Sequence, residues 1–167
     1  MVAAYKDAGY HGIVVTDHFL NGYSCMEKDW PWQKRIDGLL KGYLAAREAG
    51  EKLGLCVLLG WEYYDQGGDF LTFGLSEAFL RDHDDLCDIP LDEYVRRVRA
   101  AGGFVSQAHP YRRAAYLPEQ VAVRVDIVDG LEVFNGSHKV EQRSFDDQAL
   151  ETALAHGLLQ TAGSDAH

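Results

Sequence analysis

The stretch Leu158-Leu159-Gln160-Thr161-Ala162-Gly163-Ser164-Asp165-Ala166-His167 closes the chain, and the interpretation of the whole sequence starts from it. Its first half is typical of a buried strand, and a carboxylate and an imidazole follow two residues apart. Side chains alternate between the two faces of an extended backbone, so Asp165 and His167 would lie on the same side. Such a pair can bind a divalent metal, but a single Asp-x-His also occurs in ordinary loops. The pair is therefore evidence for a metal site only if the ends of other strands also carry possible metal ligands.

Potential metal ligands recur where other predicted strands end. Apolar runs predict strands at 12–16, 55–59, 69–75, 104–108, 129–134 and 158–162. Helical spacing of apolar residues predicts helices at 2–9, 31–53 and 141–156 and another that starts at 88–90. This alternation predicts a parallel α/β fold, in which sites lie at the carboxyl ends of the strands. The residues at those ends are Asp17, His18, Glu62, His109, Asn135, Asp165 and His167.

Imidazole, carboxylate and carboxamide groups without thiolates favour zinc, manganese or ferrous iron at a hydrolytic site. Two or three such ions would hold a hydroxide and neutralise the oxygens of a phosphoryl group. Glu62 stands alone at its strand end and is the natural candidate for a carboxylate that bridges two ions. Asp17 precedes His18 and is expected to orient a neighbouring ligand. For Asn135 two alternatives stay open, a contact to metal or substrate and a plain Asn-Gly turn.

Length and composition limit the class of protein. The 167 residues, of which 47% are hydrophobic, predict a single domain over residues 1–167. A net charge of −10 argues against a nucleic-acid partner but permits a phosphorylated substrate, because bound metals reverse the local field. The three widely spaced cysteines fit a reducing, cytoplasmic protein, and Cys56, in an apolar run, is expected in the core. No stretch of about 18 residues is apolar throughout, which argues against a membrane-spanning helix.

Five short motifs occur in a characteristic order along the chain. They are Thr16-Asp17-His18, Gly60-Trp61-Glu62, Ala108-His109-Pro110-Tyr111-Arg112, Glu132-Val133-Phe134-Asn135 and Gly163-Ser164-Asp165-Ala166-His167. Together they resemble the PHP (polymerase and histidinol phosphatase) family of metal-dependent phosphoesterases, over nearly the whole chain. The resemblance implies a distorted seven-stranded (β/α) TIM-like barrel with two or three divalent ions at the carboxyl ends of its strands.

The same resemblance implies a set of metal ligands. Glu62 would bridge two ions, with His109 on one of them and Asp165 on the other. His18 and His167 would help to hold a third ion. These roles come from the family pattern and are expectations for the chain.

The family pattern suggests a role for Arg112 but none for His138. Arg112, three residues after His109, resembles the phosphate-binding arginine of the family, and a basic residue that is merely exposed is the alternative. Its His-Pro-x-Arg context resembles the small stand-alone phosphoesterases more than the polymerase-associated branch. His138 is expected near the rim of the site, without an assigned role.

The sequence departs from the family in one respect. Family members open with a strand that ends in His-x-His and supplies two ligands, and no such motif precedes His18. We therefore expect an incomplete domain, truncated at both ends, that lacks the first strand of the barrel and binds fewer ions than the intact family site. Sheet edges that lack a partner expose unpaired backbone groups, so self-association or completion of the sheet by another segment is expected.

These observations lead to one main hypothesis and two alternatives. The main hypothesis is a phosphoesterase that hydrolyses a small phosphomonoester or nucleotide-like phosphate through a metal-bound hydroxide, with Asp17 and Arg112 assisting. The first alternative is a non-catalytic remnant that binds metal or a partner, which the missing His-x-His favours. The second is an accessory domain of a DNA polymerase, which the acidic charge disfavours.

Overall fold

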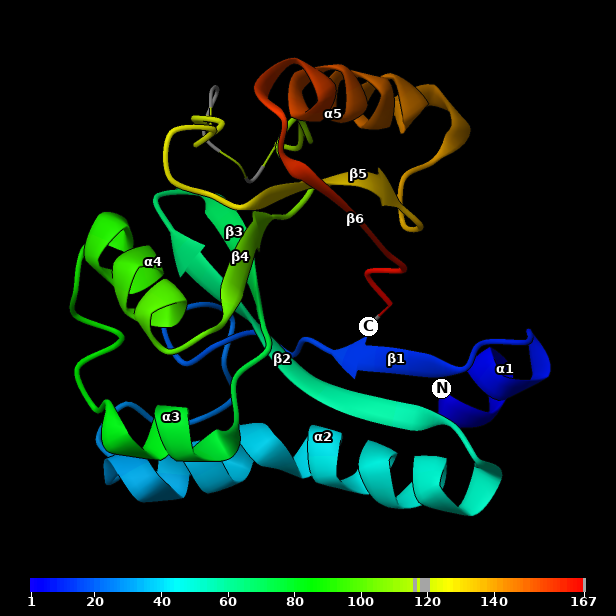
Figure 1. The fold of residues 1–167 in the computed structure, drawn as a ribbon. Helices are drawn as coiled ribbons and strands as arrows, with labels where there is room; N and C mark the ends of the chain where they lie inside the picture. The colour runs from blue at the N-terminus through cyan, green and yellow to red at the C-terminus, as the bar shows by residue number, and fades with distance from the viewer. Residues whose placement is uncertain (116, 118–120, 167) are drawn as a thin grey trace.

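Six strands form one curled sheet in which they follow each other in chain order (Figure 1). The structure is a computed structural model and describes residues 1–115, 117 and 121–166. Its strands are β1 (Gly12–Val15), β2 (Cys56–Asp65), β3 (Gly68–Phe73), β4 (Phe104–Gln107), β5 (Gly130–Asn135) and β6 (Leu159–Gly163). Strands β1 and β6 form the two edges of an open half-barrel, which is consistent with part of a TIM-like barrel. A seventh strand and the loss of a first strand stay predictions.

Helices cover the outer face of the half-barrel (Figure 1). They are α1 (Val2–Asp7), α2 (Trp32–Leu53), α3 (Glu77–Asp82), α4 (Leu91–Ala100) and α5 (Arg143–His156), with a short 3-10 helix η1 (Val140–Gln142) before α5. Helix α2 packs on β2, α4 on β4 and α5 on β5. The strongly periodic helices lie where the sequence predicts them, whereas α3 falls in a region without a predicted helix. No helix in the described part of the chain is long and apolar enough to cross a membrane.

The expectation of a wholly parallel sheet is wrong for β3. Strands β1 and β2, β4 and β5, and β5 and β6 pair in parallel, but β3 runs antiparallel to both of its neighbours. The cause is a two-residue turn, because Gln66 and Gly67 have φ angles of 45° and 90° between the paired residues Asp65 and Gly68. Two successive positive φ angles are typical of a tight hairpin turn. As a result, β3 begins at the edge of the sheet where the parallel strands end.

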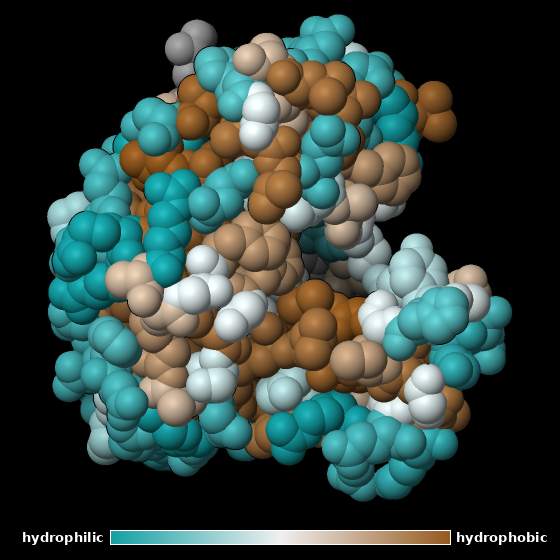
Figure 2. Space-filling view, in the orientation of Figure 1, coloured by the Kyte–Doolittle hydropathy of each residue, from teal (hydrophilic) through white to brown (hydrophobic). Residues whose placement is uncertain are grey.

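The inner face of the half-barrel is only partly covered. The side chains of Leu58 and Leu159 are 54% and 59% exposed, and Cys56, expected in the core, is exposed as well. Alternation along β2 explains this, since Val57 on the opposite face is buried in the cluster that includes Ala46 of α2. A cavity of about 460 Å³ lies beside Leu58. In Figure 2, apolar surface borders the hollow between the two ends of the sheet.

The outer core contains a buried polar network that links β2, β3 and α4. The indole Nε1 of Trp61 donates to the hydroxyl of Tyr94 at 2.6 Å, and that hydroxyl is 2.5 Å from Oγ1 of Thr72. All three side chains are fully buried. The ring of Tyr63 stacks on Tyr94 with the ring centroids 3.8 Å apart. One phenol oxygen therefore satisfies two buried polar groups.

We predict that Tyr94→Phe lowers the free energy of unfolding by about 1–3 kcal/mol, because it leaves the indole N–H and the threonine hydroxyl buried without a partner. Urea unfolding followed by tryptophan fluorescence measures this. Tyr23→Phe is the matched control, since Tyr23 is 77% exposed and should tolerate the change. Equal stability of the two variants would contradict the role given to the phenol oxygen.

Candidate metal centre

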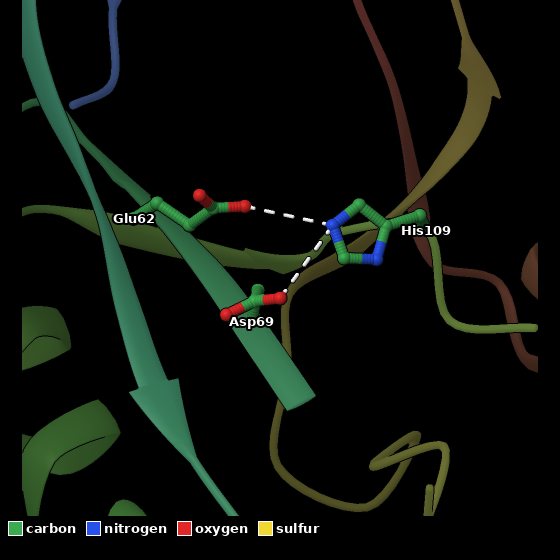
Figure 3. Close-up of side chains that lie close together, drawn as sticks. All are labelled: Glu62, Asp69 and His109. Atoms are coloured by element: carbon green, nitrogen blue, oxygen red, sulfur yellow. Dashed lines mark ion pairs between the residues drawn. The ribbon is translucent and has the colours of Figure 1, made fainter. Parts of the chain in front are cut away.

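Two carboxylates and one imidazole converge at the edge of the sheet where the parallel strands end (Figure 3). Glu62 comes from β2, Asp69 from the start of β3, and His109 from the turn after β4. The Nε2 atom of His109 is 3.6 Å from Oε1 of Glu62 and 3.6 Å from Oδ2 of Asp69. One ligand atom from each of the three residues lies within 4.8 Å of the other two. Oxygen and imidazole ligands at this spacing suit a divalent cation such as zinc, manganese or ferrous iron.

His18 contacts the opposite side of the Glu62 carboxylate. Its Nδ1 lies 2.8 Å from Oε2 of Glu62. The backbone holds the pair in place, since the segment that follows β1 forms a parallel bridge between His18 and Glu62. The N–H of Phe19 donates to the carbonyl of Glu62 at 2.7 Å, and the N–H of Glu62 donates to the carbonyl of Asp17 at 3.0 Å. Glu62 thus lies between two imidazoles, as a bridging carboxylate would require.

The surroundings shift the pKa values of the two carboxylates, Glu62 and Asp69, in opposite directions. Burial alone would raise the pKa of Glu62, but the neighbouring imidazoles of His109 and His18 outweigh it and hold that pKa at about 2. The hydrogen bond with Glu62 raises the pKa of His18. Burial, helped by the charge of Glu62, raises the pKa of Asp69 to about 6. A cation bound between these groups would favour both charged carboxylates, so the donor set fits a metal ion.

A second polar network surrounds Asp165, which follows β6. The guanidinium of Arg112 donates to its Oδ2, Ser137 donates through Oγ at 3.0 Å, and Asn135 donates through Nδ2 at 3.2 Å. Burial would raise the pKa of Asp165, but Arg112 outweighs this effect and lowers it. The Oδ1 atom of Asn135 accepts from the backbone N–H of Ser137 at 2.9 Å. Asn135 therefore forms a turn with Ser137 through its side-chain oxygen, and its side-chain nitrogen contacts Asp165.

Other candidate residues have more peripheral positions. The carboxylate of Asp17 lies against α2, where a Cβ added to Gly42 would be 2.6 Å from Oδ2. The imidazole of His138 is buried; its Nδ1 is 2.7 Å from Asp146, and its Nε2 accepts from Arg112 at 3.3 Å. Burial is the main cause that lowers the pKa of His138. The predicted ligand His167 lies outside the described residues.

Two residues of the site are absent from the predicted set. The apolar pattern places Asp69 at the start of a predicted strand and gives it no role. Gln66-Gly67, between two apolar runs, is the signal of a hairpin that places Asp69 at this edge of the sheet. Glu132 belongs to one of the five motifs, but no pattern assigns it a role. Its Oε2 accepts from the backbone N–H of His109 and from Nδ2 of Asn135, both at 2.9 Å. Glu132 thus connects the two polar networks.

Two solved structures share this fold. A protein from Bifidobacterium adolescentis, described as a candidate metal-dependent phosphoesterase, is 21% identical with a TM-score of 0.58, over 98% of this chain and 80% of that one. A two-domain protein from Bacteroides vulgatus, described as containing a predicted PHP-like metal-dependent phosphoesterase, is 21% identical with a TM-score of 0.65, over 99% of this chain and 46% of that one. Such low identity establishes the fold alone. No protein-family model and no curated protein matches the chain.

The raised pKa of Asp69 predicts a pH-dependent gain of stability in Asp69→Asn. A folded-state pKa of about 6, above the ordinary 3.8, means that the folded protein binds this proton more tightly than the unfolded chain. The stability that Asp69 contributes therefore falls as the pH rises from about 4 to 6, and the full penalty is present above that range. Metal-free Asp69→Asn should be about 1–3 kcal/mol more stable than wild type near pH 7.5, with little difference below about pH 4.

Chemical denaturation at both pH values, in the presence of a chelator, tests this prediction. Asp147→Asn, at an exposed position on α5, is the matched control and should show no such difference. An Asp69→Asn variant that is no more stable than wild type near pH 7.5 would contradict the assigned cause.

Proposed function

We propose that the protein is a divalent-metal-dependent phosphoesterase that acts on a small phosphomonoester or nucleotide-like phosphate. The observation that carries the proposal is the convergence of Glu62, Asp69 and His109, with His18 on the other side of Glu62. The fold shared with structures described as metal-dependent phosphoesterases supports it. The acidic chain would rely on bound cations to attract a phosphate group.

The proposed ligands fall into two groups. Glu62, Asp69 and His109 would hold the first ion, and the pairing of Glu62 with His18 supports a bridging role for this carboxylate. Asp165 would approach the ions after release from Arg112. When bound, a divalent ion would supply Lewis-acid stabilisation of charge on the phosphoryl oxygens. The roles of His18 and His167 as ligands of a further ion, and the choice among zinc, manganese and iron, are part of the proposal.

Arg112 is the proposed contact for the phosphate group. Its side chain is 15% exposed, and its guanidinium already donates to Asp165 and Ser137. A planar guanidinium matches a phosphate through two parallel hydrogen bonds. In this proposal a phosphoryl group takes the place of Asp165 as the partner of Arg112. Asp17, which holds the backbone of Glu62 through its carbonyl, would support the site from outside.

A second candidate function is a metal-binding or partner-binding module without turnover. The observation that favours it is the ion pair between Arg112 and Asp165, because a carboxylate that accepts from three protein donors is less available to a metal. The two functions differ in a measurable way, since only the first requires hydrolysis of a phosphate ester.

Metal binding provides the first test. We expect the protein to bind about one or more equivalents of Mn²⁺ or Zn²⁺, measured by elemental analysis and calorimetric titration. Glu62→Gln should weaken binding by more than about 100-fold, since loss of an outer-shell partner alone costs about 10–100-fold. Glu51→Gln, at an exposed position on α2, is the control and should bind normally. No binding by wild type, or equal binding by both variants, would refute the proposed centre.

Phosphatase activity provides the second test. With p-nitrophenyl phosphate and Mn²⁺, Arg112→Gln should lower kcat/KM by about 100-fold, the effect of removing one donor that stabilises the transition state. Metal content should stay near that of wild type, because Arg112 is no ligand. The neighbouring exposed Arg113→Gln serves as the control. Hydrolysis that persists after complete metal removal would refute the phosphoesterase, and metal binding without any hydrolysis would favour the non-catalytic module.

A further inference from the structure

One buried carboxylate contacts three adjacent strand ends without belonging to the group of candidate ligands. Glu132, on β5, is 3% exposed. Its Oε2 atom accepts hydrogen bonds from the backbone N–H of His109, after β4, and from Nδ2 of Asn135, at the end of β5. Its Oε1 atom lies against the backbone of Gly163, the last residue of β6. The carboxylate therefore fills the space between the ends of β4, β5 and β6.

The backbone of His109 needs such a partner. Its φ angle is +29°, in a region that side-chain-bearing residues rarely adopt, and the proline that follows disfavours compact conformations further. A conformation of this kind is unfavourable and persists only where surrounding contacts impose it. The N–H of His109 donates to a Glu132 carboxyl oxygen that is shielded from water, so water does not compete for this hydrogen bond. It holds the turn that directs the imidazole of His109 toward Glu62 and Asp69 (Figure 3).

Gly163 supplies the space that the carboxylate occupies. A Cβ added at this position would lie 2.6 Å from Oε1 of Glu132, closer than real Cβ atoms approach an oxygen. Gly163 is not among the glycines with a positive φ angle, so its backbone conformation is open to alanine. Glycine at position 163 therefore leaves room for the carboxylate of Glu132, which a larger residue would displace.

We propose that Glu132 is a positioning residue of the candidate metal centre, whose carboxylate fixes the backbone of His109 and the amide of Asn135 in the space left by Gly163. This inference rests on the proposed function where it takes His109 as a metal ligand. Glu132 acts through these neighbours, because its Oε2 is already occupied by two protein donors.

Two readouts on the full chain test the proposal. The first is the ¹H and ¹⁵N shift of the His109 amide in the metal-free protein, which reports the hydrogen bond directly. The second is the dissociation constant for Mn²⁺ and Zn²⁺. Glu132→Ala should move the His109 amide proton upfield and weaken metal binding by about 10–100-fold, the range for loss of an outer-shell partner. Glu132→Gln keeps a carbonyl acceptor for both donors, so its metal dissociation constant should stay within about 5-fold of wild type. If Glu132 acted through its charge alone, Glu132→Gln would weaken metal binding as much as Glu132→Ala does.

Gly163→Ala tests the same site without changing Glu132. Its Cβ should displace the carboxylate and so reproduce both effects of Glu132→Ala. In the Glu132→Ala background the same glycine change should add little, because the atom with which it collides is gone, and coupled neighbours of this kind are non-additive. Glu151→Ala, at an exposed position on α5, controls for the loss of one negative charge.

The outcomes separate the two proposals. Folded Glu132→Ala and Gly163→Ala variants with a wild-type His109 amide shift and wild-type metal affinity would overturn the positioning role. Strictly additive effects in the double variant would overturn the part assigned to Gly163. A wild-type protein that binds neither metal would overturn the proposed function, while the His109 amide shift would still decide whether Glu132 holds that backbone.

Discussion

The contact of Glu62 with two imidazoles constrains the positions of three strand ends. His18 approaches one carboxylate oxygen and His109 the other, from segments that follow β1 and β4. Taking a carboxylate out of water is unfavourable unless its charge is compensated, and here the two neighbouring imidazoles outweigh burial. The segment after β1 must therefore continue alongside β2 as far as Glu62, as the backbone bridge to His18 confirms. The sheet is curled, and the ends of its strands converge, which allows His18 and His109 to reach Glu62 from either side.

Polar groups at this edge of the sheet form two networks joined by one residue. One network is rich in negative charge and contains Glu62 and Asp69. The other contains Asp165 with the cationic Arg112 as its partner. Glu132 lies between them and accepts hydrogen bonds from both sides. The first network has the composition of a cation site, and the second offers a positive group beside it. These are the two features on which the proposed phosphoesterase function depends.

The sequence predicted the positions of the strands and of most helices, because continuous apolar runs and helical spacing are local properties. It also predicted that His18, Glu62 and His109 would meet, since parallel strands end at one edge of a sheet. The strand pattern does not reveal Asp69, because in a parallel sheet the start of this strand would lie at the opposite edge, and the Gln66-Gly67 turn reverses the strand. Glu132 was missed for a different reason: its partners are the backbone N–H of His109 and the amide of Asn135. Contacts of that kind depend on a strained φ angle and on the absence of a side chain at Gly163, which no periodicity encodes.

The reversed β3 strand has a consequence for the order in which the site assembles. Glu62 and Asp69 belong to one hairpin, with Tyr64 opposite Asp69 in the register. Contacts between residues so near in sequence require little loop closure, and hairpins form in about 1–10 μs, faster than pairings between distant strands. We therefore expect the two carboxylates to approach each other before the imidazoles of His18 and His109, which come from distant segments, can compensate their charge. In the proposed metal centre, one local hairpin would thus supply two of the three ligands.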